Sequence, residues 1–207
     1  MKRATTMKRM DVILSVGTLA LVLLAVVGMA ATGTLDEFGA WAWERHHNVL
    51  SWYIRPLFLL PFCYFAYRRS LFGITITLVA LATSMFWFPA PEQSSSGALE
   101  LLAMEREYLT GEWTVAKILL ALIVPLSFAA LALAFWKRSI VYGLVLINAM
   151  VLIKVVWSFY FGGGAGGLTL LPSAIVGLAV CDAVVIYLIR RRRRRSSEPS
   201  RPAGHHG

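Results

Sequence analysis

Long blocks of apolar residues, separated by short polar segments, dominate the pattern along the chain. Several blocks carry no charge over the length, about 20 residues, that a helix needs to cross the hydrocarbon core. Backbone groups in a bilayer must hydrogen-bond within the protein, which favours helices. The pattern therefore predicts an all-α fold, a polytopic integral membrane helix bundle. Six transmembrane helices are expected, over residues 12–31, 49–67, 71–89, 114–136, 139–161 and 168–189.

The composition agrees with this class and restricts the chemistry. The chain of 207 residues is 58% hydrophobic and 15% charged, whereas about a quarter of the residues in a soluble domain are charged. Cys63 and Cys181 both lie in apolar blocks, so no disulfide framework and no Cys/His metal spacing can be built. The chain contains no HExxH, P-loop or glycine-rich dinucleotide motif. The sequence predicts no cofactor, no metal and no catalytic residue.

The basic residues predict the orientation of the bundle. Fifteen of the 20 Lys and Arg residues fall on one side of the six segments. Cytoplasmic loops carry an excess of Lys and Arg, so both termini are expected in the cytoplasm, most simply at a bacterial cytoplasmic membrane. A cleaved signal peptide is the alternative for the first segment. Its apolar run exceeds the 7–15 residues or so of a signal sequence, which favours a retained anchor.

The end of the chain is predicted as an appendage to a single transmembrane domain over residues 1–189. The run Arg190–Arg195 is expected to anchor the last span and to attract anionic lipid headgroups. This interpretation is preferred to nucleic-acid binding. The rest of the 190–207 segment is polar and rich in Pro and Gly, which predicts a disordered cytoplasmic tail.

The large outer loop is predicted to contain an amphipathic helix over residues 98–109. Its apolar face is formed by Ala98, Leu101, Leu102, Tyr108 and Leu109. Glu105 lies in the middle of this face, because it is four residues from both Leu101 and Leu109. A carboxylate there loses its hydration unless a positive group meets it.

The preceding outer loop, residues 32–48, contains the segment "ERHH". It supplies too few ligands at helical spacing for a metal site. His46 falls on or near the apolar face of a short helix and is interpreted as an interfacial histidine. The run "GGGAGG" at 162–167 is expected either to give close backbone approach and mobility beside a cavity or to form a flexible turn.

Ionisable residues inside the predicted spans are the main functional candidates. A charge at the bilayer centre costs about 2.5–3.5 kcal/mol on insertion scales, so such residues face a partner or water. Arg55, Lys154 and Lys117 are biased to the outer half, and Glu105 is expected to meet at least one of them. Arg55 and Lys154 are expected to line an outward-opening polar cavity. Asp182 and Asn148 share an inward depth and are expected to pair.

Three functions fit these residues. In the first, the cations leave a net positive site that binds or transports an anionic solute or a lipid headgroup. In the second, the protein is a structural or assembly subunit whose charges form a salt-bridge network. In the third, it is an enzyme acting on a lipid-linked phosphate, with Glu105 or Asp182 as the acid or base.

Overall fold

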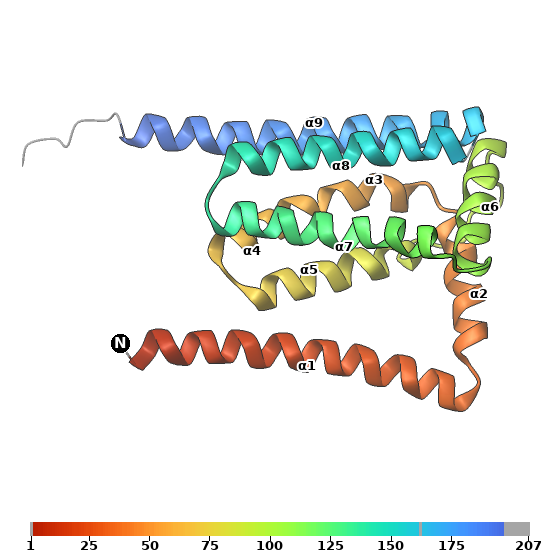
Figure 1. Ribbon diagram of the computed structural model, residues 1–207, viewed down its shortest axis with the longest axis horizontal. Helices are drawn as coiled ribbons and strands as arrows, with labels where there is room; N and C mark the ends of the chain where they lie inside the picture. The colour runs from red at the N-terminus through yellow and green to blue at the C-terminus, as the bar shows by residue number, and fades with distance from the viewer. Residues whose placement is uncertain (1, 162, 197–207) are drawn as a thin grey trace, which may run out of the picture.

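The computed structural model describes residues 2–161 and 163–196, and the regular elements in these residues are all helical. They are α1 (Lys2–Thr32), α2 (Leu35–His46), α3 (Leu50–Leu57), α4 (Leu59–Arg68), α5 (Leu71–Thr83), the 3-10 turn η1 (Ser84–Phe86), α6 (Ser96–Thr110), α7 (Val115–Trp136), α8 (Ile140–Phe161) and α9 (Gly163–Ser196). In Figure 1 the long helices run side by side, while α2 and α6 lie across one end of them. We call α2 and α6 the cap.

Four helical segments in the described residues are long and apolar enough to cross a membrane. They are Lys8–Thr32, Val115–Trp136, Ile140–Phe161 and Gly164–Arg191. A fifth is counted if Leu35–His46 and Leu50–Arg68, which are bent by 92° relative to each other, form one broken span. Leu71–Phe86 is apolar but shorter, about 24 Å at 1.5 Å per residue. The chain is therefore a helical, membrane-embedded protein, and the six-span topology stays a prediction.

The predicted second span, 49–67, is divided into α3 and α4 at Phe58. Pro61 has no N–H, so it cannot donate the helical hydrogen bond to Leu57. Next to it, the N–H of Phe58 bonds to the carbonyl of Arg55, three residues back, at 3.1 Å. The chain stays helical on both sides of this break.

The glycine run at 162–167 differs most from the predicted boundaries. The sixth span was expected to begin at 168, but α9 begins at Gly163, so an outer turn is wrong for residues 163–167. A Cβ at Gly166 would lie 3.3 Å from the backbone N of Leu101 in α6. A Cβ at Gly97 of α6 would lie 2.6 Å from the carbonyl oxygen of Ala165 in α9. The glycines therefore let α6 lie directly on α9.

Two groups of buried residues form the core. The first joins α4, α7, α8 and α9 through Phe62, Ala66, Leu131, Phe135, Ile147 and Cys181. The second lies under the cap, where Trp52 of α3 packs on Ala98, Leu101 and Leu102 of α6. The predicted amphipathic helix is thus present, and three of its five apolar positions are buried. Leu109, expected on the same face, is 54% exposed instead.

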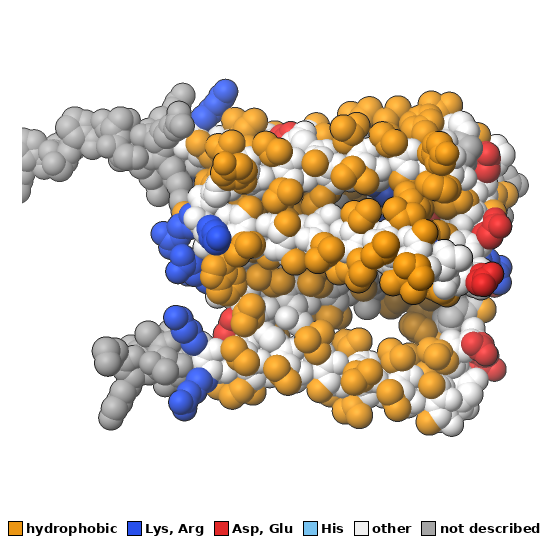
Figure 2. All heavy atoms as spheres, viewed as in Figure 1, with side chains coloured by type: hydrophobic (Ala, Val, Ile, Leu, Met, Phe, Trp, Pro, Cys, Tyr) orange, Lys and Arg blue, Asp and Glu red, His pale blue; other side chains and the backbone are white. Residues whose placement is uncertain are grey.

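The first helix is fixed to the bundle by Asp11. Its carboxylate accepts hydrogen bonds from the hydroxyl of Ser70 at 2.8 Å and from the N–H groups of Leu71 and Phe72 at 2.6 and 3.3 Å. A carboxylate at a helix N-terminus is favourable, so Asp11 stabilises the start of α5. Most of α1 is otherwise exposed, and Figure 2 shows a hollow between it and the remaining helices.

Charge divides between the two ends of the bundle. In Figure 2 the Lys and Arg side chains gather at the end where α1 begins, and the Asp and Glu side chains lie mainly at the cap end. Hydrophobic atoms cover the surface between them. Of the predicted basic anchor, α9 continues through 190–195, while residues 197–207 lie outside the described residues.

Candidate functional site

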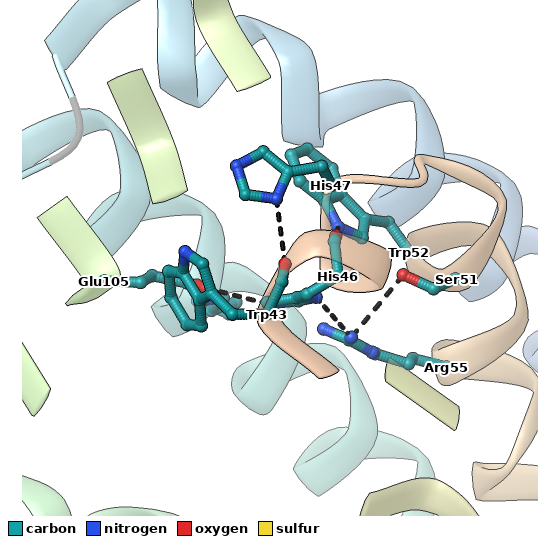
Figure 3. A network of polar contacts seen from close by, with 8 residues as sticks. Trp43, His46, His47, Ser51, Trp52, Arg55 and Glu105 are labelled. Carbon is teal, nitrogen blue, oxygen red and sulfur yellow. Dashed lines mark hydrogen bonds and ion pairs between the residues drawn. The ribbon is translucent and has the colours of Figure 1, made fainter. Parts of the chain in front are cut away.

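The carboxylate of Glu105, on α6, takes part in a network of polar contacts in the cap, of which Figure 3 shows the part from Glu105 through His46 to Arg55. Its Oε1 accepts a hydrogen bond from the ammonium of Lys154 on α8 at 2.7 Å. Its Oε2 lies 3.4 Å from Nε2 of His46, at the end of α2. The carboxylate expected to need a positive partner therefore meets Lys154, and it also meets a histidine that sequence reasoning did not place there.

The neighbours of His46 determine its protonation. Its Nδ1 lies 2.7 Å from Nη2 of Arg55, and a guanidinium can only donate. Nδ1 is therefore the acceptor, and the ring proton sits on Nε2, which donates to Glu105. His46 is 5% exposed and lies between Trp43 and Trp52, at ring-centroid distances of 5.5 and 6.5 Å.

These contacts make a continuous line from Arg55 through His46 and Glu105 to Lys154. Its members come from α3, α2, α6 and α8. Two cations and one carboxylate share it, and the histidine is neutral, so the line carries one net positive charge. Arg55 also points at the Oγ of Ser51, at 3.5 Å.

The pKa shifts in the cap agree with this assignment. Burial lowers the pKa of His46 and outweighs the opposing effect of the hydrogen bond to Glu105. Burial alone would raise the pKa of Glu105, but the hydrogen bond from His46 and the charge and hydrogen bond of Lys154 lower it to about 2. At neutral pH the histidine is therefore neutral and the carboxylate ionised.

A cavity of about 520 Å³ opens beside the Glu105–Lys154 pair, between α6, α7 and α8. Pockets of about 300–1,000 Å³ hold small ligands. Apart from Glu105, Lys154 and Ser127, its walls are apolar or aromatic. Along α7 it extends from Leu120 to Phe128, which is about 12 Å at 1.5 Å per residue. The expected polar cavity is thus a mainly apolar one with an ion pair at its side.

The other two predicted cations lie elsewhere. Arg55 does not line the cavity, and it reaches Glu105 only through His46. Lys117 donates to the carbonyl of Gly111 at 3.1 Å, and its ammonium lies over the rings of Tyr108 and Trp113. Of the three cations, Lys154 is thus the one that meets Glu105 directly, which agrees with the expectation of at least one such partner. The expected place of Arg55 in the wall is not found for this cavity, because Arg55 is directed to His46 instead.

Asn148 and Asp182 lie together, as expected, on α8 and α9. The Nδ2 of Asn148 is 3.3 and 3.4 Å from the two carboxylate oxygens of Asp182, and it also donates to the carbonyl of Leu144 at 2.9 Å. The pair shares no member with the line at Glu105 or with the cavity wall. It links two helices in the interior of the bundle.

His46 is the residue of this site that sequence reasoning missed. The available signal was its position on the apolar face of the 35–46 helix, where an interfacial role was preferred. Within residues 2–161 and 163–196, no three His, Cys, Asp or Glu side chains are grouped so that they could hold a metal ion. Comparison with protein-family models, with curated proteins and with solved structures gives no match to this chain.

The contact between Glu105 and Lys154 can be tested by a double-mutant cycle. Glu105→Gln and Lys154→Met should each lower the free energy of unfolding by about 1–3 kcal/mol, since each leaves its partner without a group of opposite charge to share the hydrogen bond. The double variant should cost less than the sum of the two. Unfolding in detergent gives the values, and Glu100→Gln on the exposed face of α6 is the control. Strict additivity would show that the two side chains do not interact.

The shifted pKa of His46 predicts how stability depends on pH. Between that lowered pKa and the usual 6.5, the unfolded chain binds more protons than the folded one. Stability should therefore fall as the pH drops below about 6.5, by at most about 1.4 kcal/mol per pH unit for one proton. Glu105 should cause a further loss of stability as the pH falls below its usual pKa of 4.5 toward its folded-state pKa of about 2.

The measurement is the unfolding midpoint in detergent between pH 8 and 5. An amide can still accept from Arg55 and donate to Glu105, so His46→Gln should flatten the curve in this range. His47→Gln makes the same change at the neighbouring residue, whose Nδ1 lies 2.8 Å from the carbonyl of Trp43. It should keep the wild-type slope. Equal slopes in all three proteins would contradict the assignment to His46.

Proposed function

We propose that the protein binds an amphiphile, with its anionic headgroup at Lys154 and its apolar chain in the cavity between α6, α7 and α8. The position of Lys154 carries this proposal. Its side chain lines the cavity, is 50% exposed, and uses one hydrogen bond on Glu105. An ammonium has three donors, so two stay free for a ligand.

The walls of the cavity suit an apolar chain. Ile123, Val124 and Ile153 line it and are 43%, 60% and 53% exposed on surfaces that belong to spanning helices. Such side chains face lipid, so a chain can enter sideways from the bilayer. The bottom of the cavity, at Ser127 and Phe128, is close to the middle of α7. The site therefore suits a headgroup near the cap and a tail that extends toward the bilayer centre.

A structural or assembly role is the second candidate. The exposed surface of α1 supports it, since Leu21 and Leu24 are 69% and 66% exposed. A partner helix would bury such side chains. An enzyme on a lipid-linked phosphate is less well supported, because a carboxylate with a pKa of about 2 is a weak general base at neutral pH.

We further propose six spans, with both termini in the cytoplasm and the cap outside a bacterial cytoplasmic membrane. In this topology α3 with α4 forms one span and α5 with η1 forms another, and the four long helices bring the total to six. The collection of Lys and Arg at the end opposite the cap supports this orientation. With this topology the Lys154 site lies in the outer leaflet of the bilayer.

The topology is tested by labelling single cysteines in whole cells. Cys63 and Cys181 are buried and would be replaced by Ala. Ser95→Cys should then react with a membrane-impermeant maleimide from outside. Ser197→Cys should react only after permeabilisation. Three spans separate Ser95 from Ser197 in this topology, so reaction of both from the same side would contradict it.

The lipid site is tested by native mass spectrometry of the detergent-purified protein with added phosphatidylglycerol. Lys154→Met removes the proposed headgroup contact and should weaken retention of this lipid by about tenfold, as expected for loss of a charged hydrogen bond. Lys137→Met removes the same charge at the opposite end of the bundle and should retain the lipid like the wild type. Equal loss in both variants would indicate attraction by net charge and contradict a site at Lys154.

A further inference from the structure

The rings of two aromatic residues at the cap end of the cavity interact with the ammonium of a lysine in the same chain. Tyr108 and Trp113 line the cavity. The ammonium of Lys117 lies 4.9 Å from the ring centroid of Tyr108 and 4.7 Å from that of Trp113. Lys117 itself does not line the cavity. The ligand would therefore meet two rings that already interact with a positive charge.

Lys117 is fixed in this position by three contacts. Its ammonium donates to the carbonyl of Gly111 at 3.1 Å, and its backbone N–H donates to the hydroxyl of Thr114 at 3.3 Å. The hydroxyl of Tyr108 donates to its backbone carbonyl at 3.1 Å. The corner between α6 and α7 is built so that the ammonium stays beside the two rings.

Aromatic rings of this kind normally attract cations, and groups of them recognise quaternary ammonium heads such as choline. A second cation at Tyr108 and Trp113 would lie beside the ammonium of Lys117 and be repelled by it. A zwitterionic headgroup thus loses the contact that its cation would otherwise gain. Its phosphate would still meet Lys154, so the discrimination acts on the positive part of the headgroup.

The line at Glu105 restricts the negative part. Arg55, His46, Glu105 and Lys154 carry one net positive charge, which a single negative charge neutralises. The two free donors of Lys154 suit two oxygens that share that charge. Both a phosphodiester and a carboxylate have such oxygens.

We propose that the cavity selects a lipid whose headgroup carries one negative charge and no cation, and that Lys117 is the residue that excludes zwitterionic lipids. This inference rests on the proposed function, since it assumes that an amphiphile occupies the cavity. It adds the class of ligand and a specificity-determining residue outside the cavity wall.

The experiment uses the full chain in vesicles and lipids with brominated acyl chains, which quench nearby tryptophan. Trp157 lines the cavity, so the difference between each protein and its Trp157→Phe form isolates the signal from the site. The brominated probes are phosphatidylglycerol, phosphatidylcholine and a free fatty acid. Comparing the first and third separates a phosphodiester from a carboxylate.

Phosphatidylglycerol should bind to the wild type about tenfold more tightly than phosphatidylcholine. Lys117→Met should tighten phosphatidylcholine binding by about tenfold, the order expected for a cation at desolvated aromatic rings. Lys117→Arg keeps a cation beside the rings and should keep the wild-type preference. Lys137→Met, the control, should do the same.

Two results would overturn the inference while leaving the proposed function in place. One is equal binding of phosphatidylglycerol and phosphatidylcholine to the wild type. The other is an unchanged preference in Lys117→Met, provided that this variant still binds phosphatidylglycerol. If Lys117→Met fails to fold, the wild type is compared with Lys117→Arg instead. Loss of the preference for phosphatidylglycerol in Lys117→Arg would then also overturn the inference. Absence of quenching at Trp157 by all three probes would remove lipid binding in the cavity, and with it the proposed function.

Discussion

The arrangement of the cap depends on one carboxylate that lies on the apolar face of a helix. A charge at this place costs free energy unless donors surround it, and α6 cannot supply them itself. Glu105 obtains them from His46 of α2 and Lys154 of α8, at 3.4 and 2.7 Å. These contacts decide which side of α6 faces the bundle. With α6 fixed in this way, Tyr108 and the following corner lie over the space between α7 and α8, which becomes the cavity.

The neutral His46 between Arg55 and Glu105 determines how Lys154 is used. If Arg55 met Glu105 directly, which was one of three pairings considered from the sequence, a fork of two hydrogen bonds would satisfy both oxygens of the carboxylate. Lys154 would then have no anion of its own. With His46 as the bridge, Arg55 is held at a distance and one oxygen stays available to Lys154. The half-exposed ammonium is in this way positioned by Glu105 without using all its donors.

The sequence was sufficient for features that depend on local spacing. The apolar blocks predicted helices near those observed, the 98–109 pattern predicted α6, and matched depth predicted the contact of Asn148 with Asp182. Features that depend on how helices meet could not be predicted. The 92° bend that brings His46 to Arg55 comes from packing rather than from a periodic signal. Likewise, the glycine run left both a close backbone approach and a flexible turn open, and the contact of residues 163–167 with α6 is made within a helix.

Lys117 and Lys154 show why counting charges is insufficient to locate a site. Both were placed from sequence in the outer half of the bundle, as candidate partners of the same carboxylate. The difference between them comes from their acceptors, because Lys117 finds a backbone carbonyl and two rings in its own corner, while Lys154 on α8 finds only Glu105 among the described ion pairs. The ammonium of Lys117 is held by contacts within the protein and changes what the rings of Tyr108 and Trp113 can bind. The ammonium of Lys154 remains open to the cavity, where an anion can share it with Glu105.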